Sequence, residues 1–64
     1  MLKIGFYLNE INYRGISNSV YLFAKNNETI LKNKSIIFYW SKSIDNKKEV
    51  IKKFKKSFKL YKVQ

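Results

Sequence analysis

The sequence predicts an α/β fold with a three-stranded parallel sheet, and two observations carry the prediction. Three short segments rich in β-branched and aromatic residues, 2–8, 35–40 and 60–63, alternate with two segments that have apolar residues at helical spacing, 17–33 and 46–59. Each helical segment is long enough to form the crossover that joins parallel strands. Such crossovers are right-handed, so we expect both helices on one face of the sheet and the strand order 3-2-1.

The first predicted strand, residues 2–8, places Leu2, Ile4, Phe6 and Leu8 on one face. Residues 9–16 contain two Asn and one Gly without an apolar period, which indicates a loop. We expect Ser17 or Ser19 to cap the following helix.

The first helix is predicted from an apolar stripe that faces a sheet. The stripe consists of Val20, Phe23, Ala24, Asn27 and Leu31, with Ile30 beside it. We expect the helix to end near Asn33, because Asn tolerates the left-handed conformation that often closes helices.

The second strand, residues 35–40, is apolar on both faces, which is typical of a strand inside a sheet that is covered on both sides. Helices on one face only would leave the other face bare, and we expect Ile37 and Tyr39 on that bare face. A strand with two apolar faces conflicts with a sheet that is covered on one face only. This conflict predicts that residues 1–64 form a single truncated unit, a partial Rossmann-like β-α-β-α-β arrangement.

The second helix, residues 46–59, is predicted to begin with Asp45 or Asn46 as its cap, with a capping box over residues 46–49. Its apolar stripe consists of Val50, Ile51, Phe54 and Phe58, and lysines cover its other face. Residues 60–63 then begin the third strand.

Composition narrows the classes of function. The chain has no His and no Cys, and its four acidic residues are scattered, so we expect no metal site, no cofactor and no catalytic residues within these 64 residues. The formal net charge is +10, and Lys, Asn and Ile fill 28 of 64 positions. These three residues share A/T-rich codons, so codon usage is a sufficient explanation of the charge.

No segment approaches the roughly 20 apolar residues of a membrane span, and no signal peptide is recognisable. We therefore expect a cytoplasmic protein. The lysine-rich helix gives it one surface for peripheral contact with an anionic membrane.

The order of residues resembles the N-terminal domain of GT-B glycosyltransferases, the retaining group with two Rossmann-like domains. The resemblance lies in the opening strand of residues 1–7, the stretch 15–24 (GISNSVYLFA) and the second strand of residues 33–39. It implies an enzyme that transfers a sugar from a nucleotide-sugar donor to a glycan or other acceptor. In that family the donor binds mostly to the C-terminal domain, so this chain would supply part of the acceptor-side wall of the cleft.

The loop after the first strand holds the candidate binding residues, because open α/β sheets bind ligands beyond the carboxyl ends of their strands. Asn9 and Glu10 can bond sugar hydroxyls, and Arg14 suits a phosphate or carboxylate. Gly15 permits close approach of a ligand or a positive φ. Ser17 can bond a phosphate or hydroxyl, or cap the helix.

Two further interpretations stay open from the sequence. The chain is alternatively a small basic binding module for nucleic acid or an anionic membrane surface, or a remnant without function. We do not expect specific binding of nucleic acid, because Arg14 is the only arginine and the aromatic residues follow the apolar stripes.

Overall fold

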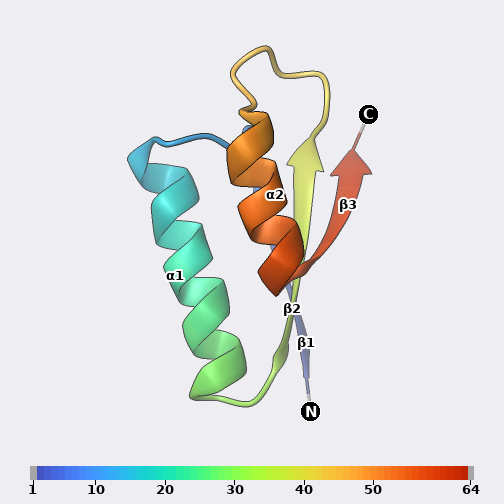
Figure 1. Cartoon of the computed structure of the whole chain (residues 1–64). Coiled ribbons are helices and arrows are strands. Elements are labelled where there is room, and N and C mark those ends of the chain that lie inside the picture. The colour runs from blue at the N-terminus through green and yellow to red at the C-terminus, as the bar shows by residue number, and fades with distance from the viewer. Residues whose placement is uncertain (1, 64) are drawn as a thin grey trace.

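The structure is a computed structural model that describes residues 2–63. Within these residues the chain forms five elements in the order β-α-β-α-β (Figure 1). Their bounds are β1 Lys3–Leu8, α1 Gly15–Thr29, β2 Lys34–Trp40, α2 Lys48–Ser57 and β3 Lys59–Val63.

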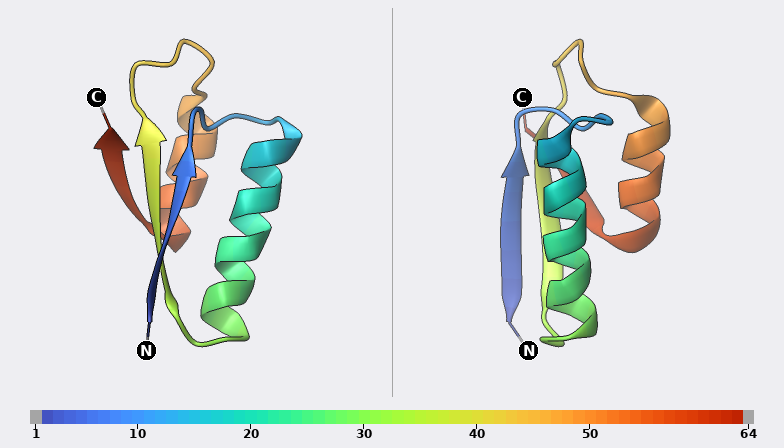
Figure 2. Two further views of the ribbon diagram at one scale, coloured as in Figure 1. Left: turned by 180° about the vertical axis from the view of Figure 1, so that it is seen from behind. Right: turned by 90° about the vertical axis from the view of Figure 1, so that its left-hand side faces the viewer.

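The predicted topology is confirmed. The three strands are parallel and lie in the order β1-β2-β3, with β2 in the centre. Both helices lie on the same face of the sheet, as the edge-on view in Figure 2 shows. The carboxyl ends of all strands, and the loops that follow β1 and β2, therefore meet at one edge.

Both predicted ends of the first helix are wrong. α1 begins at Gly15 with Arg14 as its N-cap and no capping side chain, so neither Ser17 nor Ser19 is the cap. Ser17 is instead buried in the first turn, where its hydroxyl bonds the preceding loop. The helix ends at Thr29, and the left-handed residue is Lys32, with φ of 61°, rather than Asn33.

The predicted cap of the second helix is also wrong. Lys47 is the N-cap of α2 and makes no side-chain cap bond, so Asp45 and Asn46 do not cap it and no capping box forms. The Asn46 side chain bonds the first loop instead. The apolar stripe is confirmed, since Val50, Phe54 and Phe58 are buried.

The two faces of β2 are the reverse of the prediction. Ile37 and Tyr39 are 0% and 3% exposed and lie under the helices. The bare face carries Phe38 and Trp40, which are exposed. The register explains the exchange, because Ile37 lies beside Phe6 of β1 and Leu60 of β3, both of which pack against the core.

The stripe predicted for the first helix is right in part. Ala24 and Asn27 are buried and Val20 packs against the core. Phe23, Ile30 and Leu31 are exposed, contrary to the prediction. The sheet stops at β1, so in the described residues nothing covers that side of α1.

Candidate functional site

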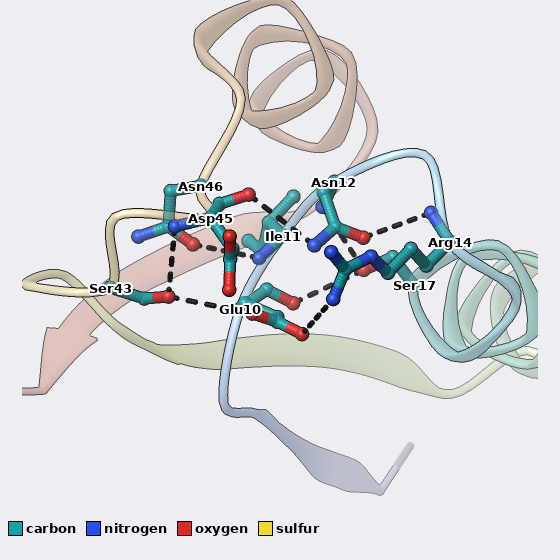
Figure 3. Close-up of polar contacts among 8 residues, drawn as sticks. All are labelled: Glu10, Ile11, Asn12, Arg14, Ser17, Ser43, Asp45 and Asn46. Atoms are coloured by element: carbon teal, nitrogen blue, oxygen red, sulfur yellow. Dashed lines mark hydrogen bonds and ion pairs between the residues drawn. The ribbon is translucent and has the colours of Figure 1, made fainter.

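The candidate site lies where the loop after β1, residues 9–14, meets the loop after β2, residues 41–47 (Figure 3). The two loops are far apart in sequence but follow neighbouring parallel strands, so both leave the same edge of the sheet. Three kinds of hydrogen bond hold them together: between backbone groups, between side-chain amides and the backbone, and between a hydroxyl and a carboxylate.

Asn46 makes the main connection between the loops. Its Oδ1 accepts a hydrogen bond of 2.8 Å from Ile11 N, and its Nδ2 donates one of 2.9 Å to Trp40 O. Next to it, Lys47 N donates to Ile11 O at 2.8 Å. Both backbone groups of Ile11 are thus satisfied, which its complete burial requires.

Asn12 and Ser17 shape the turn into α1. Asn12 N donates to Ser17 Oγ at 3.1 Å, and Ser17 Oγ donates to Glu10 O at 3.1 Å. Asn12 Oδ1 accepts a bond of 2.9 Å from Arg14 N, which closes an Asx turn. The hydroxyl of Ser17 is therefore occupied by the loop itself.

Glu10 and Arg14 form the charged part of the site. Arg14 Nη1 lies 3.5 Å from Glu10 Oε1, and Ser43 Oγ lies 3.5 Å from Glu10 Oε2. The Arg14 side chain is 70% exposed. Such an exposed pair adds little stability, so Arg14 can turn towards a ligand at small cost.

All five predicted binding residues line one hollow of about 440 Å³: Asn9, Glu10, Arg14, Gly15 and Ser17. They do not contribute equally, because Ser17 is only 2% exposed while Arg14 and Gly15 are exposed. Whether these residues bind a substrate stays a prediction.

A second depression, which the sequence did not indicate, adjoins the first across Asn9 and Glu10. Its other lining residues come from the ends of β1 and β2 and from the second loop: Tyr7, Trp40, Lys42, Ser43 and Ile44. Trp40 and Tyr7 point to the bare face by the pleat of their strands. The signal available in the sequence was Trp40 at the carboxyl end of β2, next to a polar loop.

Gly15 has an ordinary backbone conformation, contrary to one role expected for it. No glycine in the described residues has a positive φ, and a Cβ built on Gly15 would meet nothing within 4 Å. Neither the turn nor the packing of the chain therefore requires glycine here.

Tyr13 lies beside the site, in the loop just before Arg14. Desolvation, followed by a hydrogen bond to Glu49 and the negative charge of Glu49, raises the pKa of Tyr13 above 10.0.

In residues 2–63, no group of acidic side chains is placed to hold a metal ion. Within the same residues, no helix has the length and apolar character that crossing a membrane requires.

Comparison with known proteins adds no identification: no family model, curated protein or solved structure matches the chain.

Proposed function

We propose that the chain is the N-terminal part of a GT-B glycosyltransferase, in which residues 9–17 form part of the acceptor-side wall of the cleft. The whole enzyme would move a sugar from a nucleotide-sugar donor to a glycan or other acceptor. The proposal is supported by the parallel β-α-β-α-β order and by the position of the candidate residues at the carboxyl edge of the sheet.

The observation that carries the proposal is the geometry at Gly15. The free chain has room for a larger residue at this position, so glycine serves no structural need that the structure reveals. A ligand that approaches the backbone closely would explain the residue. The first hydrogen bond of α1 runs from Asn18 N to Arg14 O, so the N–H groups of residues 15–17 precede it and face the carboxyl edge.

Each site residue then has a role of its own. Asn9 and Glu10 bond sugar hydroxyls, and Arg14 pairs with a phosphate or carboxylate. The backbone at Gly15 contacts the ligand directly. Ser17 holds the loop in shape through its two bonds to residues 10 and 12.

A basic membrane-binding module is the weaker candidate. A helix that enters a membrane surface needs a free apolar face. In α2 that face is used by the sheet, since Val50, Phe54 and Phe58 are at most 6% exposed. The lysines alone provide only a salt-sensitive electrostatic contact.

Replacing Gly15 with Ala tests the proposal. Ala fits the open space and suits the first turn of a helix, so stability should stay equal or rise by up to about 1 kcal/mol. The amide chemical shifts of residues 9–17 report the binding of oligosaccharides and nucleotide sugars. We expect weak binding to the unchanged chain, with a Kd of about 1 mM, and an affinity at least tenfold lower in the variant.

Ser19→Ala is the matched control, because Ser19 is exposed in the same helical turn but does not line the hollow. In a longer protein that carries the donor domain, Gly15→Val should cut sugar transfer and Arg14→Ala should raise the KM. Unchanged binding and transfer in all Gly15 and Arg14 variants would show that the loop is only a connection.

A further inference from the structure

The depression that adjoins the candidate site, here called the Trp40 depression, has the character of a ligand pocket. Its volume is about 680 Å³, and ligand pockets have volumes of about 300–1,000 Å³. Such pockets combine aromatic surface with a few polar groups. The Trp40 depression has both, since Tyr7 and Trp40 line it together with Glu10 and Ser43.

Trp40 is held firmly at the carboxyl edge of the sheet. It is the last residue of β2, and its carbonyl oxygen accepts hydrogen bonds from Asn46 Nδ2 at 2.9 Å and from Ser43 N at 3.4 Å. Trp40 is nevertheless 39% exposed. A large aromatic side chain is therefore fixed in place while part of its surface stays open to a ligand.

The Glu10 carboxylate stands between the Trp40 depression and the hollow at Gly15 (Figure 3). Its Oε1 lies 3.5 Å from Arg14 Nη1 on the side of that hollow, and its Oε2 lies 3.5 Å from Ser43 Oγ on the side of the depression. Both distances are long for hydrogen bonds, so neither contact uses the carboxylate fully. Glu10 can consequently accept hydrogen bonds from a ligand that spans both cavities.

Further strands and helices of a longer Rossmann-like domain are not expected to fill the depression. Such elements pack on apolar surface, which the middle of the bare face provides at Phe38 and Tyr61, whose rings stack at 5.6 Å. The depression lies beyond them at the carboxyl edge, where a packed helix would bury Glu10 and Lys42 at a high cost. Ligands of open α/β sheets bind at this edge.

A sugar ring matches the groups that line the depression. One face of a pyranose ring presents C–H groups, which pack against the apolar face of an aromatic ring. Its hydroxyls lie around the rim, where they can bond a carboxylate, an amide or another hydroxyl. Trp40 offers the aromatic surface, and Glu10 and Ser43 offer the polar groups beside it.

We propose that the Trp40 depression binds a second sugar ring of the acceptor, which stacks on the indole while the first ring occupies the hollow at Gly15. Asn9 and Glu10 line both cavities and bond hydroxyls of the two rings where these are joined. The inference rests on the proposed function and narrows its substrate class. The acceptor is a glycan of at least two sugar units rather than a single sugar.

Trp40 is the only tryptophan of the chain, so its indole N–H resonance and its fluorescence report this depression directly. The probes are maltose, cellobiose and lactose, each compared with the methyl glycosides of glucose and galactose, and UDP. We expect at least one disaccharide to shift the indole resonance together with the amides of Asn9 and Glu10. Its Kd should be about 1 mM, about tenfold below that of the methyl glycosides.

Variants of the two exposed aromatic residues of β2 separate stacking from folding. Trp40→Leu should lower the affinity for the disaccharide about tenfold, measured at the Asn9 and Glu10 amides, whereas Trp40→Phe should stay within about threefold because it keeps a ring. Phe38→Leu is the matched control. Phe38 lies on the same face and is 37% exposed, but it lines neither cavity, so its loss should leave the affinity unchanged. Circular dichroism confirms that each variant keeps its helices.

The possible failures are distinguishable. Shifts at residues 9–17 without a shift of the indole, or an unchanged affinity in Trp40→Leu, would overturn the inference and leave the proposed function standing. An indole that responds to UDP and to none of the sugars would also overturn it, because a nucleotide would then occupy the depression. If no sugar shifts either the indole or residues 9–17, both the inference and the proposed function fail.

Discussion

Replacing Asn46 with Ala should destabilise the fold more than its position in an irregular loop suggests. The side chain is the acceptor for Ile11 N at 2.8 Å and the donor for Trp40 O at 2.9 Å. Ile11 is 0% exposed, so water cannot replace the bond to its N–H. Trp40 is 39% exposed, and water can reach its carbonyl more easily.

The magnitude follows from these exposures. A buried N–H without a partner costs about 1–3 kcal/mol, and a bond that water replaces costs about 0.5 kcal/mol. We therefore expect a loss of about 2 kcal/mol in the free energy of unfolding. At about 4–8 °C per kcal/mol for a domain of this size, the Tm should fall by about 8–16 °C.

Urea and thermal unfolding followed by circular dichroism at a fixed protein concentration provide the assay. Asn46→Asp keeps an acceptor for Ile11 N and loses only the bond to Trp40 O, which water can replace, so it should cost about 0.5 kcal/mol. Asn18→Ala is the control, because Asn18 is exposed and its bond to Tyr13 O, at 3.2 Å, is open to water. Its cost should stay below about 0.5 kcal/mol. Equal losses in Asn46→Ala and Asn18→Ala would refute the claim that Asn46 joins the two loops.

Three further predictions concern other parts of the molecule. Ser35→Ala should lower the free energy of unfolding in urea by about 2 kcal/mol. The buried Ser35 hydroxyl accepts a hydrogen bond from Asn27 Nδ2 and donates one to Ala24 O, both at 2.9 Å. A loss below about 0.5 kcal/mol would contradict this prediction. Glu49→Gln should lower the pKa of Tyr13 towards 10.0 in absorbance titrations at alkaline pH, with Tyr13→Phe to assign the signal. The raised pKa favours the neutral phenol in the fold, so its contribution to stability is present below pH 10.0 and is lost as the pH rises through the folded pKa. Binding of a dT oligonucleotide should be weak, independent of sequence, and abolished between about 50 and 200 mM salt; tight, selective binding at the higher salt would favour a nucleic-acid module.

The order and type of all five elements could be predicted, because each shows either a clear period or, for β2, a short run of β-branched and aromatic residues. β1 alternates, and α2 repeats its apolar residues at helical spacing. The ends of the helices could not be predicted from local capping preferences. The two side chains best suited to cap the helices make other contacts. Ser17 bonds the first loop, and Asn46 joins the second loop to Ile11. Asn46 and Ile11 are 35 residues apart in the sequence, so the local sequence gives no sign of their contact.

The face of β2 was mispredicted because both of its faces are apolar and periodicity alone cannot distinguish them. A usable signal was present in β1, where Lys3, Gly5 and Tyr7 form a poorer apolar face than Ile4, Phe6 and Leu8. The register places Gly5 beside Ile36 and Tyr7 beside Phe38, which assigns these residues of β2 to the bare face. The register itself depends on pairing across 31 residues and was not available from the sequence.

The candidate site could be located from the sequence because its position follows from topology, but its internal connections could not. The loop is fixed at Ile11, whose side chain is buried and whose N–H and C=O both bond the second loop. Asn9 and Glu10 lie just before this fixed point, and Arg14 and Gly15 lie just after Asn12, which is also buried. The candidate binding groups are thus held in place without a ligand. A loop arranged in advance loses less conformational entropy on binding, and the bonds through Asn46 to the second loop are what keep it in that arrangement.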